Sequence, residues 1–207
     1  MRLFALLALT AFLPGCAALS ALQGEPDRDV FELRAPRPAA ASCSPGQGRE
    51  LVVELPKTRG TLDSERIMIR PSTLQTQYLP DAVWGDTVPV TLQRLLVESL
   101  GAYDSFTHVG RAPLGASGDH AMLTEIKDFN AEVAGNGALI RLTVDAQMVR
   151  EMDARIVSRG QFTASAPAAS TRTGDLIPAF DAASQDLIAQ MTAWGLRAVG
   201  INPASCR

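Results

Sequence analysis

Residues 138–166 constrain the fold more than any other part of the chain, because apolar and polar side chains alternate there twice. Residues 138–148 place an apolar set on one face, and residues 154–166 repeat the pattern after a turn near residues 151–153. A period of two is typical of strands with one buried and one wet face, so the sequence predicts a long antiparallel hairpin. The residues expected on its buried face are Ala138, Ile140, Leu142, Val144, Ala146, Met148, Ala154, Ile156, Gly160, Phe162, Ala164 and Ala166.

Shorter strands should extend this hairpin into a sheet. The sequence Gly135-Asn136-Gly137 is typical of a tight turn and would join the hairpin to the strand before it. Residues 78–87, in contrast, contain proline, glycine and aspartate and indicate a turn-rich approach to a helix. Apolar runs predict four further strands, over residues 51–55, 67–70, 105–109 and 122–133.

Two amphipathic helices are expected. The first has Thr87 as its cap, Pro89 just inside it, leucines spaced by three and four residues, and Gly101 as its stop. The second has Pro178 in its first turn and an apolar stripe that continues to Trp194. The order of these elements predicts an α+β fold, in which two helices pack on one face of a mostly antiparallel sheet.

The chain begins with a segment typical of a secretion signal. Arg2 precedes an unbroken run of apolar or small residues from Leu3 to Leu13. A helix of this length would span roughly 17 Å, well short of the ~30 Å hydrocarbon core of a bilayer. We therefore expect residues 1–15 to be a cleaved signal peptide and not a membrane span.

The end of this segment, Leu13-Pro14-Gly15-Cys16, resembles the bacterial lipobox. The resemblance implies lipidation of the Cys16 sulfur, cleavage before Cys16 and acylation of the new amino terminus, with palmitate among the acyl chains. Several acyl chains hold a protein on a bilayer durably. Ala17 replaces the aspartate that commonly retains such proteins in the inner membrane, which implies anchoring in the outer membrane, facing the periplasm. The alternative is a secreted protein in which Cys16 is incidental.

The mature chain divides into a spacer and one domain. Residues 16–48 are rich in Ala, Pro, Ser, Gly and Gln, apart from an orderly patch at residues 30–33, and are expected to be a flexible spacer. Residues 49–207 contain the predicted strands and helices without an internal repeat, and are expected to form a single domain.

The two remaining cysteines lie near mobile ends of the predicted fold. Cys43 belongs to the spacer and Cys206 is the penultimate residue. Because an oxidising compartment favours disulfides, we predict a Cys43–Cys206 bond. Closing so long a loop would add at most about 5 kcal/mol of stability in the chain-entropy model. Two unpaired thiols are the alternative.

Composition argues against several classes of function. Charged residues make up 20% of the chain, with interleaved signs and a formal net charge of −3, so the basic patch of a nucleic-acid-binding protein is missing. The chain has only two histidines, His108 and His120, and no CxxC pair, so no metal or other cofactor is expected. His120 follows Asp119, but no GxSxG motif or comparable signature accompanies the pair. We therefore predict no catalytic residues and no enzyme activity.

Contacts with a partner protein are then the expected chemistry. Tyr78 and Trp84 flank a proline-containing segment in a chain with only 5% aromatic residues. Both combine a large apolar area with a polar group, as residues at interface hot spots do. Packing of this segment on the first helix is the alternative. The wet face of the 138–166 hairpin is an equally plausible contact surface.

Several short features occur together in a fixed order along the chain. They are the lipobox at Cys16, Leu62-Asp63 through Arg66-Ile67 to Arg70-Pro71, Tyr78 followed by Trp84, the leucine-rich helix after Pro89, the set Leu123, Ile126 and Phe129, the 138–166 hairpin and the last helix with Trp194. In this order they resemble a known family, the auxiliary lipoproteins of ABC-type transport systems, which include the PqiC-like lipoproteins. Gly85 is a small departure, because alanine is more usual there, and Cys43 and Cys206 lie outside the matching region.

This resemblance implies a non-catalytic component of the outer membrane. It would work with a periplasmic MCE-domain protein and with an inner-membrane permease and ATPase, moving lipids or other apolar molecules across the envelope. The alternative is a lipoprotein that binds and activates a cell-wall synthase or the lipopolysaccharide export machinery. A ring-like homo-oligomer is compatible with both hypotheses.

Overall fold

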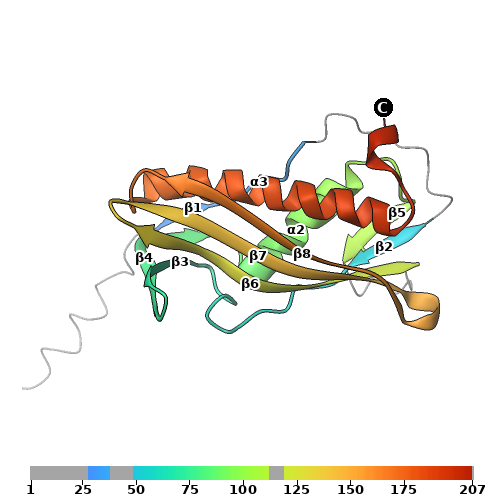
Figure 1. Cartoon of the computed structure of the whole chain (residues 1–207), viewed down its shortest axis with the longest axis horizontal. Helices are drawn as coiled ribbons and strands as arrows, with labels where there is room; N and C mark the ends of the chain where they lie inside the picture. Colours follow the sequence, from blue (N-terminus) through green and yellow to red (C-terminus); the bar gives the residue numbers. More distant parts are fainter. Residues whose placement is uncertain (1–27, 38–48, 112–118, 207) are drawn as a thin grey trace, which may run out of the picture.

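The computed structural model describes residues 28–37, 49–111 and 119–206 of the 207-residue chain. These residues form a curled eight-stranded sheet and two long helices on one side of it (Figure 1). The strands are β1 (Asp29–Phe31), β2 (Glu50–Val53), β3 (Arg66–Ser72), β4 (Gln75–Trp84), β5 (His108–Arg111), β6 (His120–Ala134), β7 (Gly137–Arg150) and β8 (Arg155–Ala168). The helices are α2 (Val88–Gly101) and α3 (Thr173–Ala198), with short 3-10 turns η1 (Glu151–Asp153) and η2 (Pro203–Ser205).

The sheet is organised around β6. One edge of β6 pairs with β7 along its length, and β7 pairs with β8, both antiparallel. The first part of the other edge is parallel to β2 and the last part is parallel to β3. Strand β5 adds to β2, whereas β4 and then β1 add to β3. A single 15-residue strand thus supports two short strands placed end to end.

The α+β class is confirmed, but the expectation of a mostly antiparallel sheet is wrong. Among the strands that the structure describes, four of the seven pairings are parallel: β1–β4, β2–β5, β2–β6 and β3–β6. The sequence-based expectation assumed that strands pair with their neighbours along the chain. Only β3–β4, β6–β7 and β7–β8 do so, while β2 reaches β5 and β6 across long connections.

The predicted hairpin is confirmed as strands β7 and β8. Buried and half-buried residues alternate along the whole of β7. The turn before it also follows the prediction, because Gly135 has a φ of +59°, which glycine adopts without strain. The end of the hairpin near the β7–β8 turn differs from the prediction. The register shifts there between Met148 and Val149, and Ile156, which was expected in the core, is 36% exposed.

Residues 75–84 form a strand where a turn-rich segment was expected. Strand β4 lies between β1 and β3. Its register against β3 changes between the Arg66–Val83 pair and the Met68–Tyr78 pair, and Pro80 falls inside this irregular stretch. A proline is tolerated there because no regular ladder hydrogen bond requires its missing N–H. Tertiary pairing therefore outweighs the local turn signal.

Both helices were predicted correctly in position and type. Pro89 is in the first turn of α2, as expected. Helix α3 begins earlier than expected, at Thr173, so Pro178 lies inside the helix and not in its first turn. The helices contact each other, and the hydroxyl groups of Thr192 and Ser99 are hydrogen-bonded between them at 2.9 Å. Within the described segments, no helix combines the length and the hydropathy needed to cross a membrane.

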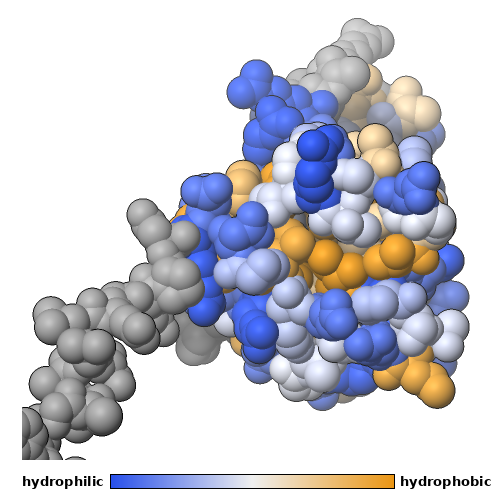
Figure 2. Space-filling view, turned by 90° about the vertical axis from the view of Figure 1, so that its left-hand side faces the viewer, coloured by the Kyte–Doolittle hydropathy of each residue, from blue (hydrophilic) through white to orange (hydrophobic). Residues whose placement is uncertain are grey.

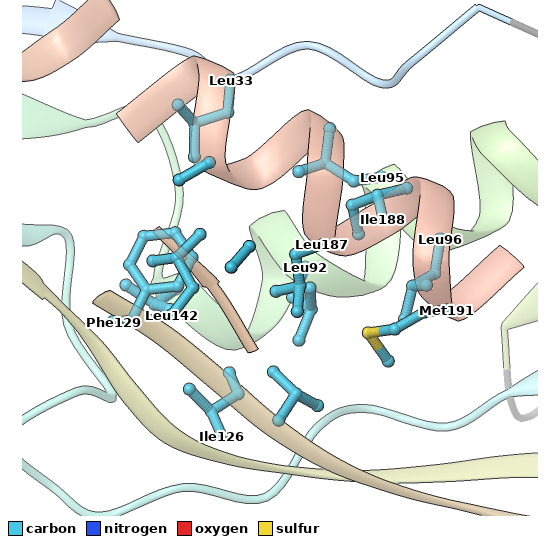
Figure 3. Close-up of a cluster of buried hydrophobic side chains, with 14 of the residues drawn as sticks. Leu33, Leu92, Leu95, Leu96, Ile126, Phe129, Leu142, Leu187, Ile188 and Met191 are labelled. Carbon is cyan, nitrogen blue, oxygen red and sulfur yellow. The ribbon is translucent and has the colours of Figure 1, made fainter. Parts of the chain in front are cut away.

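The hydrophobic core lies between the helices and the sheet. Figure 3 shows side chains of α2 and α3 pointing toward those of β6 and β7. An aromatic group closes one end of this core: the rings of Phe129 and Phe180 are stacked at 5.8 Å, and Trp84 meets Phe180 edge-on at 5.3 Å. The labelled residues are Leu33, Leu92, Leu95, Leu96, Ile126, Phe129, Leu142, Leu187, Ile188 and Met191.

Candidate interaction surfaces

The polar groups considered for catalysis do not converge. His108 is exposed at the start of β5, whereas His120 is half-buried at the start of β6. Burial lowers the pKa of His120, and the positive charge of Arg49 adds to this effect. The Asp119 carboxylate accepts a hydrogen bond from the backbone N–H of Glu50 at 2.8 Å. In the described parts of the chain, no three His, Cys, Asp or Glu side chains form a group that could hold a metal ion.

Residues 28–37 form an arm that is docked on the domain, although residues 16–48 were expected to be a spacer. Strand β1 pairs with β4, and the side chain of Leu33 is buried in the core. The arm is fixed by Arg34, which donates to the Asp181 carboxylate of α3 from its backbone N–H (3.1 Å), Nε (3.2 Å) and Nη2 (2.5 Å). Arg94 of α2 donates to the Leu33 carbonyl at 3.0 Å. The rest of the expected spacer, residues 16–27 and 38–48, lies outside the described residues.

The ion pair between Arg34 and Asp181 should make the free energy of unfolding depend on pH. Burial alone would raise the pKa of Asp181, but the hydrogen bonds from Arg34 outweigh it, and the pKa lies below the ordinary value of 3.8. A lowered pKa means that the stabilisation is present above pH 3.8 and is lost as the pH falls through the lowered value.

We therefore expect Asp181→Asn to lower the urea midpoint at pH 7, and this effect to shrink progressively as the pH falls below 3.8. The reason is that acid protonates the wild-type carboxyl and removes the same charge. Urea titrations of both proteins, at pH 7 and at a series of pH values below 3.8, measure this difference. An effect of the substitution that stays the same at all these pH values would contradict a stabilising ion pair between Arg34 and Asp181.

The end of the long axis opposite to the one where the arm enters carries the turn between β7 and β8 (Figure 1). We call residues 150–157, which join β7 to β8, the distal tip. Met152 is 85% exposed there, and Ile156 and Val157 are 36% and 37% exposed. Of these, Met152 projects furthest into solvent, and an exposed apolar side chain on a projecting turn is a candidate contact residue. The sequence pattern missed this surface because it assigned Ile156 to the core, although an unburied methionine in a turn was a usable signal.

The distal tip is held in shape by polar contacts and a strained turn. Arg150 donates to the Asp153 carboxylate from Nε and Nη2 at 3.0 and 2.7 Å. The hydrogen bond from Arg150 lowers the pKa of Asp153 to about 2, so the pair is ionised at neutral pH. Ala154 completes the turn with a φ of +53°, a left-handed conformation that is unfavourable for residues with a Cβ.

Replacing Ala154 by glycine should raise the free energy of unfolding by about 0.5–1 kcal/mol, because glycine adopts this conformation without strain. Thermal or urea unfolding measures the change. Ala134→Gly is a matched control in an exposed strand position without positive φ, and it should be neutral or destabilising. Equal effects of the two substitutions on the free energy of unfolding would show that the backbone of Ala154 is not strained.

Tyr78 and Trp84, the aromatic residues predicted to contact a partner, have different surroundings. Trp84 is only 2% exposed and packs edge-on against Phe180, so its ring is part of the core and not available to a partner. Tyr78 is half-buried: its hydroxyl donates to the Thr61 carbonyl at 3.1 Å, and the Arg66 guanidinium lies 3.9 Å from its ring centre. Only Tyr78 retains some exposed ring surface.

The wet face of the β7–β8 hairpin is rich in paired polar groups. Arg141 makes a two-pronged contact with Glu132, with both distances 3.0 Å. Asp145 accepts a hydrogen bond from Gln161 at 2.8 Å and lies 3.6 Å from the Lys127 ammonium. These contacts are those of a solvated sheet face whose charges are largely matched within the chain.

The predicted lipidation site, Cys16, and the predicted disulfide partner Cys43 lie outside the described residues. Cys206 follows η2 and is half-buried against the core. The Cys43–Cys206 disulfide stays a prediction. We expect the unfolded mature protein to react with maleimide only after reduction. Labelling of the two thiols without a reductant would contradict the bond.

Comparison with known proteins places this domain in a family. The model of the family described as ABC-type transport auxiliary lipoprotein component matches residues 31–192, from β1 through most of α3. An uncharacterized protein of Bradyrhizobium diazoefficiens is 24% identical over 184 residues, which cover 85% of this chain and 47% of the relative. The chain therefore spans about half the length of that relative.

Solved structures share the fold. A Xanthomonas campestris protein of the DUF330 family superimposes with a TM-score of 0.71 at 22% identity, covering 82% of this chain and 96% of the other. A hypothetical protein of Chlamydia trachomatis gives a TM-score of 0.50 at 12% identity, covering 74% and 99% of the two chains. These likenesses concern the fold alone. The match over residues 31–192 shows that the chain belongs to the ABC-type transport auxiliary lipoprotein components.

Proposed function

We propose that this protein is a non-catalytic lipoprotein, anchored in the outer membrane through Cys16 and facing the periplasm. It works with a periplasmic MCE-domain protein and with an inner-membrane permease and ATPase, in the movement of lipids or other apolar molecules. It acts by contact and leaves ATP hydrolysis to its partners.

The family match carries this proposal. It begins at Phe31, the last residue of β1, and includes the rest of the docked arm, strands β2 to β8 and most of α3. The family description supplies the role as an auxiliary of ABC-type transport. The lipobox at Cys16 supports a lipid anchor upstream of this unit.

The shape of the domain supports a role between membrane and partner. The docked arm enters at one end of the long axis, and the distal tip lies at the other (Figure 1). A chain tethered through its N-terminus would therefore direct the distal tip away from the anchor. Exposed Met152, Ile156 and Val157 suit a contact with an apolar patch of a protein partner.

Co-purification tests the proposal. The tagged full-length protein is extracted from producing cells in mild detergent, and the proteins bound to it are identified by mass spectrometry. We expect an MCE-domain protein together with a permease and an ATPase. Repeated recovery of a cell-wall synthase or of lipopolysaccharide export proteins, without those three, would contradict it and favour the alternative role.

A photo-crosslinking amino acid at Met152 tests which surface makes the contact. Because Met152 is 85% exposed, the replacement leaves the fold intact. The expected product is a crosslink to the MCE-domain protein. Gln161, on the wet face of β8, is the control position and should give a much weaker product. Equal crosslinking from both positions would show that the distal tip is not the contact.

A further inference from the structure

We infer that the end of the domain where the arm enters rests on the lipid surface, with Leu74 at the β3–β4 turn inserted among the lipid headgroups. This inference rests on the proposed anchor at Cys16. It adds an orientation and a second membrane contact, made by the folded domain itself.

The tether is short enough to hold this end at the bilayer. Eleven residues, 17–27, separate the expected anchor at Cys16 from Arg28, where the docked arm begins. Even a fully extended chain of this length reaches only about 40 Å. A spacer extending to residue 48 would have allowed a far larger separation, but Leu33 and Arg34 fix the arm to the core.

The β3–β4 turn at this end is suited to contact with lipid. Leu74 is 97% exposed at the turn, the highest exposure among the large apolar side chains of the described residues. From Pro71 to Pro80 the chain carries no charged side chain, so that entering the headgroup layer would not require a charge to be desolvated. Arg70 closes the turn by donating to the Thr73 carbonyl at 2.8 Å.

An apolar band also crosses this end. Figure 2 views the molecule from this end and shows a band of hydrophobic side chains across it, with hydrophilic side chains on either side. The elements that end here carry half-buried apolar residues, among them Val133, Leu139 and Ile177. Strand β1 runs parallel to the last part of β4, with Asp29 opposite Ala82, so the chain that precedes β1 lies on the side of the β3–β4 turn that contains Leu74. The tether and the apolar surface thus belong to the same end, which favours lipid over a protein as the occupant.

Tryptophan fluorescence in vesicles tests this orientation. The full-length lipidated protein carrying Leu74→Trp is reconstituted into phosphatidylethanolamine–phosphatidylglycerol vesicles with and without brominated acyl chains. Met152→Trp is the matched control, because Met152 is also highly exposed, in a turn at the other end. Trp84 and Trp194 contribute the same background to both variants.

We expect brominated lipid to quench the Leu74→Trp signal at least threefold more strongly than the Met152→Trp signal, with a blue shift for the former only. Vesicle flotation is measured on the same samples. If the protein floats but the two variants are quenched equally, the orientation is wrong while the anchor stands. If the protein does not float, the proposed lipid anchor at Cys16 is wrong, and so is the inferred orientation that rests on it.

Discussion

Replacing Phe180 by alanine should lower the free energy of unfolding by about 3–5 kcal/mol, the range found for large aromatic residues in well-packed cores. The ring is fully buried and lies between Phe129, stacked at 5.8 Å, and Trp84, edge-on at 5.3 Å. Phe180 belongs to α3 and these two neighbours belong to β6 and β4, three elements that cannot all close on the vacated space. Urea unfolding followed by far-UV circular dichroism measures the loss.

Phe162→Ala is the control for this prediction. Phe162 is only half-buried and packs on Trp194 at a ring distance of 5.4 Å, between β8 and α3. Phe162→Ala should lower the free energy of unfolding clearly less than Phe180→Ala does. Equal losses would mean that the aromatic group of Trp84, Phe129 and Phe180 contributes no more to stability than the half-buried pair of Phe162 and Trp194.

Replacing Cys16 by serine should remove nearly all of the protein from the outer-membrane fraction. A serine hydroxyl cannot form the thioether to the diacylglyceryl group, so the acyl chains are lost, and no helix among the described residues is long and apolar enough to cross the bilayer in their place. Cell fractionation on a sucrose gradient measures the change. Cys206→Ser is the matched control and should leave the distribution unaltered. An unchanged outer-membrane signal for Cys16→Ser would contradict the anchor.

The elements predicted correctly from sequence are those with a long local period. Strand β7 and both helices each show a repeat over ten residues or more, and their buried faces follow it. The pairing of β2 and β3 with β6 could not be predicted in the same way, because short strands carry no signal that identifies a distant partner. The parallel part of the sheet was therefore missed.

The arm and the strand beside it were missed for related reasons. The segment around Leu33 and Arg34 is short and proline-rich, and its docking depends on Asp181, 147 positions later in the chain. Strand β4 contains the turn-forming pair Pro80-Asp81, yet pairing on both sides holds it in the sheet. In each case a contact between distant residues outweighs local composition.

The exposed candidate surfaces could not be identified from local sequence either. Aromatic character drew attention to Trp84, which instead fills the core. Met152 and Leu74 are more exposed, but each is a single apolar residue in a turn and has no periodic pattern. Their significance depends on lying at opposite ends of the folded domain, which only the three-dimensional arrangement reveals.

The central claim is that a lipid anchor at Cys16 holds a contact module at the membrane. Mass spectrometry of the N-terminal peptide, from protein purified out of the membranes of cells that make it naturally, tests this most directly. The account predicts a peptide that begins at Cys16 and carries both the diacylglyceryl group and an amide-linked acyl chain. An unmodified Cys16 thiol, or a mature chain that begins at another residue, would contradict it.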